Sequence, residues 1–113
     1  MLARVRSAAV LGIDAYLVDV EIDISNGLPT FSTVGLPQGA VREGRERVAA
    51  SLGNAGFTFP LNRITANLAP ADIPKSGSAF DLPIALGVLA ASEQLAWQPE
   101  RDSIVIAGEL GLE

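Results

Sequence analysis

Residues 16–24 alternate without interruption between two kinds of side chain. One set is apolar or aromatic, and its members are Tyr16, Val18, Val20, Ile22 and Ile24. The other set is mostly acidic, and its members are Leu17, Asp19, Glu21 and Asp23. A period of two is typical of a strand that has one face on a core and the other in solvent. The segment therefore predicts a half-buried strand.

The preceding residues predict the partner of this strand. Residues 3–9 also alternate, and Gly12-Ile13 suits a two-residue turn that begins with glycine. Placing Leu11 opposite Asp14 fixes the register of the hairpin. It predicts the cross-strand pairs Val5 with Val20 on the core face, and Arg6 with Asp19 and Arg4 with Glu21 on the other. Because the arginines account for two of three carboxylates on that face, we expect no metal site there.

The rest of the chain is expected to add three strands and two helices. A hairpin turn at Asn26-Gly27 leads into a strand over 28–34. A helix opened by Pro37 follows and ends near Leu52, where Gly53 or Gly56 stops it. The remaining elements are a strand over 62–68, a helix over 78–92 and a last strand over 103–109. Val41, Val48 and Leu52 would face inward on the first helix, and its outer face carries the i,i+4 pairs Arg42–Glu46 and Glu43–Arg47. We interpret that outer face as solvated, and the whole as an α+β sandwich of strands and two helices.

The second helix is apolar nearly all round. Its residues 82–90 leave no polar stripe, so the helix is either sandwiched inside the domain or left for a missing neighbour to cover. Because only residues 110–113 follow the last strand, we expect a C-terminally truncated domain. If the missing elements normally cover this helix, part of Leu82, Leu86 or Leu89 should be exposed, or buried by self-association.

Composition narrows the chemistry that the chain can perform. Its 113 residues suffice for one domain, residues 1–113, with a single core. The absence of Cys and His excludes disulfides, thiolate nucleophiles, imidazole bases and the usual zinc ligands. A net charge of −5 disfavours direct nucleic-acid binding, which depends on phosphate neutralisation. Since residues 82–91, the longest apolar run, are too few to span a membrane, we expect a soluble cytoplasmic domain without membrane contact.

Ser78 is the only serine placed like a nucleophile, at the start of a helix. Without His its base would be a lysine or a carboxylate, and an exposed Lys75, the only lysine, would stay protonated. A capping role needs no catalysis, because Ser78 and Asp81 have the spacing of a capping box, although Pro83 would suit Asp81 as the cap. Asp72 and Asp81 flank the loop as a possible acid pair, but no sugar-binding aromatic lies nearby, so we expect them to make local hydrogen bonds. We therefore assign no catalytic, cofactor-binding or metal residue, with Ser78 and Lys75 as the remaining catalytic candidates.

Motifs along the whole chain carry a family resemblance. They are Leu2-Ala3-Arg4-Val5, Gly35-Leu36-Pro37, Val41-Arg42-Glu43, Arg45-Glu46-Arg47-Val48, Gly77-Ser78-Ala79-Phe80-Asp81-Leu82-Pro83 and Gly108-Glu109-Leu110. In this order they resemble the N-terminal domain of the ComM/YifB family of magnesium-chelatase-like AAA+ ATPases. The resemblance implies a fold similar to the proteolytic domain of Lon. It also implies a non-catalytic accessory domain of a longer protein.

The resemblance further implies what that longer protein does. It would bind ATP and Mg²⁺ through a P-loop further along, assemble as a homo-oligomeric ring, and remodel DNA in recombination and natural transformation. This chain has no Gly-x4-Gly-Lys-Ser/Thr sequence, so its expected partner is its own AAA+ domain rather than ATP or nucleic acid. The alternative is a serine peptidase domain that uses Ser78. Its lysine would lie outside these residues, since Lon-like peptidases place it roughly forty residues after the serine, and Phe80-Asp81 departs from the peptidase pattern.

Overall fold

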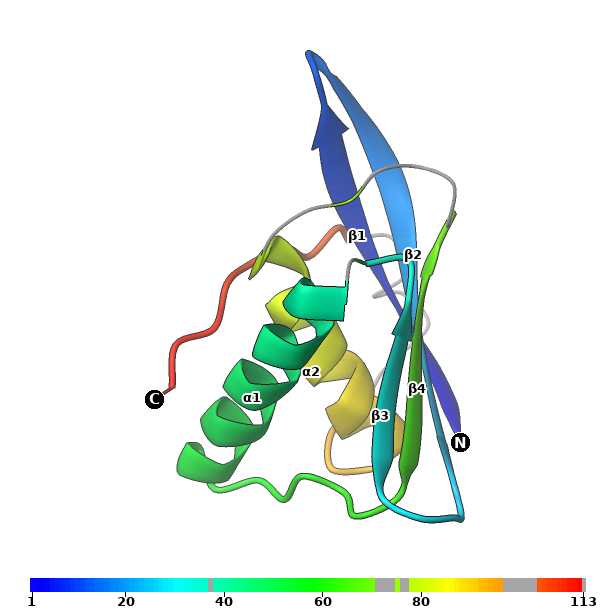
Figure 1. Cartoon of the computed structure of the whole chain (residues 1–113), viewed down its shortest axis with the longest axis vertical. Coiled ribbons are helices and arrows are strands. Elements are labelled where there is room, and N and C mark those ends of the chain that lie inside the picture. Colours follow the sequence, from blue (N-terminus) through cyan, green and yellow to red (C-terminus); the bar gives the residue numbers. More distant parts are fainter. Residues whose placement is uncertain (37, 71–74, 76–77, 97–103, 113) are drawn as a thin grey trace.

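The computed structural model describes residues 1–36, 38–70, 75, 78–96 and 104–112 (Figure 1). Its elements are β1 (Leu2–Leu11), β2 (Asp14–Ser25), β3 (Thr30–Val34), α1 (Gln38–Asn54), β4 (Arg63–Ala69), the 3-10 turn η1 (Ser78–Phe80) and α2 (Asp81–Ala91). The strands form one sheet in the order β1-β2-β4-β3. Both helices lie on the same side of this sheet (Figure 1). The predicted α+β arrangement of strands and two helices is confirmed.

The β1–β2 hairpin has the predicted register. Leu11 lies opposite Asp14, and Gly12 in the turn has a φ of 64°, a left-handed conformation that glycine adopts without strain. The predicted pairs Val5 with Val20, Arg6 with Asp19 and Arg4 with Glu21 all occur. Val5 and Val20 are fully buried, so alternation and turn together assigned the core face correctly.

The prediction of a second hairpin is wrong. β3 does not pair with β2, because β4 lies between them, antiparallel to β2 and parallel to β3. The core-facing side chains of β4, Ile64, Ala66 and Leu68, are fully buried. Alternate side chains of the shorter β3 are exposed. The more apolar strand therefore occupies the interior of the sheet, and the more polar one forms an edge.

α1 ends with the motif that its glycines predict. Gly56 has a φ of 93°; its N–H donates to the carbonyl of Gly53 at 3.1 Å, and the N–H of Phe57 donates to the carbonyl of Leu52 at 2.9 Å. These two bonds define a Schellman motif, in which the left-handed residue is usually glycine. Gly56 rather than Gly53 is therefore the residue that ends the helix. Of the predicted inward residues, Val48 and Leu52 are buried, and the side chain of Val41 lies outside the described part.

α2 packs between the sheet and α1. A Cβ at Gly87 would overlap the side chain of Ile22, so the helix approaches β2 most closely at a glycine. Leu89 is buried, whereas Leu82 and Leu86 are half-buried. The helix is thus sandwiched inside the domain and still leaves part of two leucines at the surface, as expected.

The prediction of a last strand is wrong over the described residues 104–109, and Ser103 lies outside them. One backbone hydrogen bond links the segment to β1, from the N–H of Ile106 to the carbonyl of Arg6 at 2.9 Å. At Gly108 its backbone-to-backbone bonds go to η1 and α2 instead. Helix starts carry backbone N–H groups without a partner inside the helix, and these compete with a strand edge for the segment.

Candidate functional site

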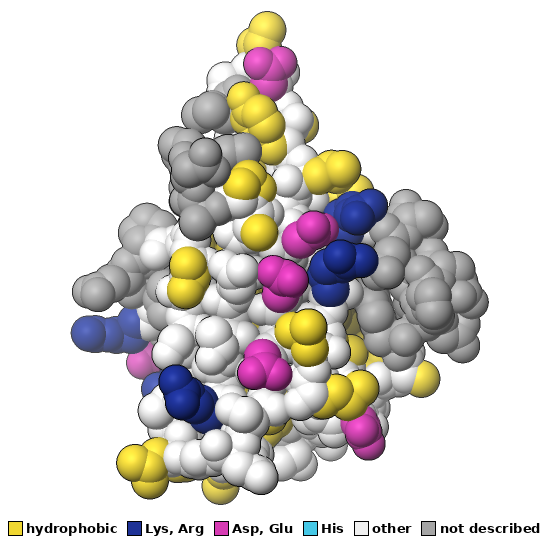
Figure 2. Space-filling view, turned by 90° about the vertical axis from the view of Figure 1, so that its right-hand side faces the viewer, with side chains coloured by type: hydrophobic (Ala, Val, Ile, Leu, Met, Phe, Trp, Pro, Cys, Tyr) yellow, Lys and Arg dark blue, Asp and Glu magenta, His cyan; other side chains and the backbone are white. Residues whose placement is uncertain are grey.

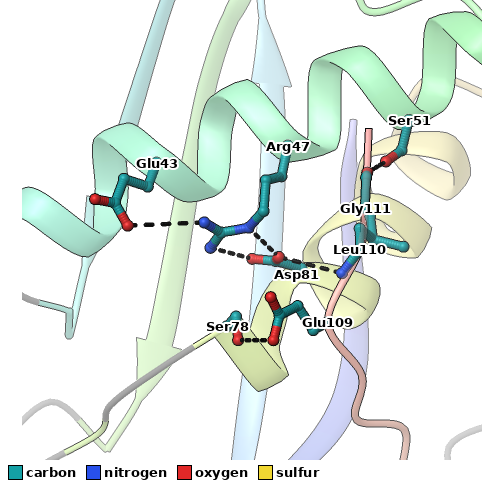
Figure 3. A network of polar contacts seen from close by, with 8 residues as sticks. All are labelled: Glu43, Arg47, Ser51, Ser78, Asp81, Glu109, Leu110 and Gly111. Carbon is teal, nitrogen blue, oxygen red and sulfur yellow. Dashed lines mark hydrogen bonds and ion pairs between the residues drawn. The ribbon is translucent and has the colours of Figure 1, made fainter. Parts of the chain in front are cut away.

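Asp81 is the centre of a polar network where α1, the start of α2 and residues 104–112 meet (Figure 3). Its side chain is only 3% exposed. Arg47 of α1 binds both carboxylate oxygens, with Nε–Oδ2 at 2.6 Å and Nη2–Oδ1 at 3.2 Å. The N–H of Leu110 donates to Oδ2 at 3.3 Å. Two-point guanidinium–carboxylate contacts are among the stronger polar interactions, so Asp81 links three segments that are distant in sequence. The expectation of local hydrogen bonds for Asp81 is therefore wrong.

The interpretation of the α1 outer face as solvated is wrong for Arg47. The hydrogen bond to Asp81 raises the pKa of Arg47 above its ordinary value, against the opposing effect of burial. The predicted partner Glu43 lies on its other side, at 3.8 Å from Nη1. Arg42 and Glu46 form no ion pair in the part of the chain that the structure describes. A buried carboxylate requires a bound countercharge, which explains why Arg47 turns toward α2.

Ser78 is not the N-cap of α2, contrary to the prediction. Its hydroxyl donates to Oε2 of Glu109 at 2.6 Å. The N-cap residue is Phe80, which makes no side-chain capping bond, and Asp81, the other candidate, is the first residue of the helix. Ser78 and Asp81 therefore have the spacing of a capping box without forming one. Instead, Ser78 binds residue 109 and Asp81 binds residue 110.

Residues 104–112 supply the cap that no local motif provides. The N–H of Leu82 donates to the carbonyl of Gly108 at 3.0 Å, and the N–H of Gly108 donates to the carbonyl of Ala79 at 2.8 Å. Pro83, the next residue of the first turn, has no N–H to satisfy. A backbone acceptor that comes from 26 residues away leaves no trace in the local sequence.

The two catalytic candidates have different partners. Lys75 is buried, at 6% exposure, contrary to the exposed lysine assumed from the sequence, and its ammonium group donates to the carbonyl of Pro70. The hydroxyl of Ser78 donates to Glu109, which is exposed. No hydrogen bond joins Ser78 to Lys75 among these described residues, and Asp72 lies outside them. A serine nucleophile needs a base within hydrogen-bond reach, and the group in that position is the carboxylate of Glu109.

Two further residues of the network were missed from the sequence. Ser51 donates to the carbonyl of Gly111 and Asn54 donates to the carbonyl of Leu112. With Arg47 they have the spacing i, i+4, i+7, which places all three on one face of α1. That polar stripe was the available signal. Nothing in the sequence indicated that its partner would be the backbone of residues 111 and 112.

The acidic face of β2 holds no metal cluster among the described residues. Arg6 donates to Asp19 at 3.4 Å, and Asn67 of β4 donates to Glu21 at 3.1 Å. Figure 2 looks onto this face of the sheet, where acidic and basic side chains lie side by side. Asp19 and Glu21 are therefore each bound by a side chain of a neighbouring strand.

The fold and the network define a small α+β domain whose polar residues connect its own elements. A family model described as subunit ChlI of Mg-chelatase matches residues 20–113. Competence protein ComM of Haemophilus influenzae is 56% identical over 94 residues, or 83% of this chain, and protein YifB of Escherichia coli is 48% identical over 111 residues, or 98%. The chain therefore belongs to the magnesium-chelatase ChlI family, together with the ComM and YifB proteins.

The match covers only part of these relatives. The chain spans 18% of the length of the Haemophilus protein and 22% of the length of the Escherichia protein. YifB of Salmonella typhimurium, 49% identical over 111 residues, is covered to the same 22%. In the described residues, no helix is long and apolar enough to cross a membrane.

Proposed function

We propose that the chain is a non-catalytic accessory domain, residues 1–113, of a longer ATPase of the ComM/YifB type. The observation that carries the proposal is the contact of Ser78. The hydroxyl of Ser78, the only serine placed like a nucleophile, donates a hydrogen bond to the exposed carboxylate of Glu109, and the ammonium group of the only lysine, Lys75, donates to a backbone carbonyl. Neither arrangement supplies the activated nucleophile that a serine hydrolase needs.

The activity of the longer protein is part of the same proposal. It would bind ATP and Mg²⁺, act as a homo-oligomeric ring in the cytoplasm, and remodel DNA in recombination and natural transformation. The relatives support this, because each is several times longer than the chain and one carries the name competence protein. The absence of a P-loop sequence here supports ATP binding in another part of the protein.

DNA contacts are proposed to lie mostly outside this domain as well. The chain carries a net charge of −5, and the exposed sheet face in Figure 2 mixes both signs of charge instead of forming a basic patch. Affinity for DNA depends on neutralising phosphates with basic side chains. This domain would therefore serve its own ATPase part, with a fold similar to the proteolytic domain of Lon.

The proposal is tested on the full-length protein that contains this chain. Ser78→Ala should leave ATP hydrolysis and ATP-dependent DNA remodelling at the level of Ser32→Ala, a matched exposed serine on β3. Loss of either activity in Ser78→Ala alone would contradict a non-catalytic role. The alternative, a serine peptidase domain that uses Ser78 and a lysine outside this chain, predicts peptide hydrolysis that Ser78→Ala abolishes.

A further inference from the structure

Residues 106–112 contact the rest of the domain mainly through their backbone. Three N–H groups of the segment donate hydrogen bonds: Ile106 to Arg6, Gly108 to Ala79 and Leu110 to Asp81. Three of its carbonyls accept hydrogen bonds: Gly108 from Leu82, Gly111 from Ser51 and Leu112 from Asn54. The partners come from β1, from η1 with the start of α2, and from α1. The segment therefore contacts four elements without belonging to a helix or strand itself.

The same residues bury little apolar surface. Leu112 is 63% exposed, and Val105, just before the segment, is 47% exposed. Leu110 is only partly buried where it packs against the core. By contrast, β2 contributes fully buried side chains such as Val18, Val20 and Ile22. Regions with few buried apolar contacts open at lower free energy than the core to which they bind.

We propose that residues 106–112 form a strap that opens as a unit while the sheet and helices stay folded. In the closed state the strap is held by Ser51 and Asn54 of α1 and by Asp81 of α2, and Arg47 positions Asp81. Opening frees the N–H of Leu82 and uncovers the side chain of Leu82, which lies next to Gly108.

The strap would thus control access to the start of α2. The idea that the strap connects this domain to an ATPase part rests on the proposed function. The opening itself depends only on contacts within this domain. The two ideas can therefore fail separately.

Amide hydrogen exchange on the full-length protein tests the strap. Ser51→Ala combined with Asn54→Ala removes two donors to strap carbonyls and changes no apolar core residue. The amides of Gly108 and Leu110 should then exchange roughly tenfold faster or more, while the amides of β2 keep their rates. Asn54→Ala alone, at an exposed position that should not impair folding, should give a smaller increase at the same amides. The matched control is Arg42→Ala on the exposed side of α1.

Two results would overturn the strap. One is unchanged exchange at Gly108 and Leu110 in both variants. The other is an equal acceleration in β2, which would mean that the segment opens only with the whole domain. The exchange experiment does not depend on ATP hydrolysis. A full-length protein without ATPase activity would therefore contradict the proposed function and leave the exchange result standing.

Discussion

The β1–β2 hairpin and the network around Asp81 are built from different kinds of information. In the hairpin, each residue pairs with one that a two-residue turn brings opposite to it, and the buried side chains are all small or apolar. Around Asp81, the partners come from α1, α2 and residues 104–112, and the contacts are polar. The hairpin can be derived from nearby residues, whereas the network exists only once the whole domain has assembled.

The comparison also shows how the two regions should respond to change. An apolar pair loses free energy in proportion to the surface that a mutation removes. A buried ion pair loses much more when one partner is removed, because the remaining charge stays buried without compensation. Single substitutions in the two regions should therefore change the free energy of unfolding by different amounts. In each region, a substitution at a nearby exposed position should change it very little.

The largest effect is expected at the network. Arg47→Ala leaves the carboxylate of Asp81 buried without its countercharge, and should lower the free energy of unfolding by about 3 kcal/mol. Urea unfolding measures the change. Arg42→Ala, an exposed arginine on the same helix, should change stability by less than about 0.5 kcal/mol. Equal shifts for the two variants would mean that the Arg47–Asp81 pair does not hold the network together.

The hairpin should show an intermediate effect that depends on the face. Val20→Ala removes fully buried methyl groups and should cost about 2 kcal/mol. Leu17→Ala, on the opposite face of β2 and 59% exposed, should cost less than about 0.5 kcal/mol despite the larger side chain. Similar costs at the two positions would contradict the assignment of faces.

The end of α1 should give a smaller effect with opposite signs at two glycines. Gly56→Ala places a side chain at a φ of 93° and should cost about 1 kcal/mol. Gly53→Ala, within the helix and with open space around the position, should stabilise by about 0.5 kcal/mol. Thermal or urea unfolding of both variants checks the prediction, and a stabilising Gly56→Ala would contradict the Schellman motif.

These regions also mark how far the sequence alone could go. Period-two alternation, a glycine turn and a glycine helix end gave the hairpin register and the end of α1 correctly, because each signal lies within a few residues of what it determines. The predicted helix start at Pro37 lies outside the described residues. The place of β3 in the sheet was wrong, because strand order depends on a competition with β4 that local patterns do not describe. Adjacent residues alone could not show that Gly108 would cap α2.

The candidate site followed the same division. Ser78, Lys75 and Asp81 were identified from residue type and position, but their partners were not. Ser78 was assigned to a cap because Asp81 follows at the right spacing, and both side chains instead bind groups from residues 109 and 110. The polar stripe of Arg47, Ser51 and Asn54 was visible, and only the folded domain shows that it faces a backbone.

The smallest predicted effect tests whether Ser78 acts as an N-cap or only donates a hydrogen bond to Glu109. Ser78→Ala removes one hydrogen bond to an exposed carboxylate and should cost about 0.5 kcal/mol or less. Loss of an N-cap would cost about 1 kcal/mol. Urea unfolding of Ser78→Ala beside the control Ser32→Ala measures the difference, and a cost at the capping value would favour a cap after all.

The most direct test of the non-catalytic role is the reactivity of Ser78. The full-length protein is incubated with a serine-directed fluorophosphonate, digested, and the peptide that contains Ser78 is examined by mass spectrometry. Because the group that accepts the hydrogen bond of the Ser78 hydroxyl is an exposed carboxylate, which is a weak base, we expect Ser78 to remain unlabelled while a known serine hydrolase in the same tube is labelled completely. Covalent labelling of Ser78 in the native protein but not in the denatured protein would contradict the account and establish a serine hydrolase.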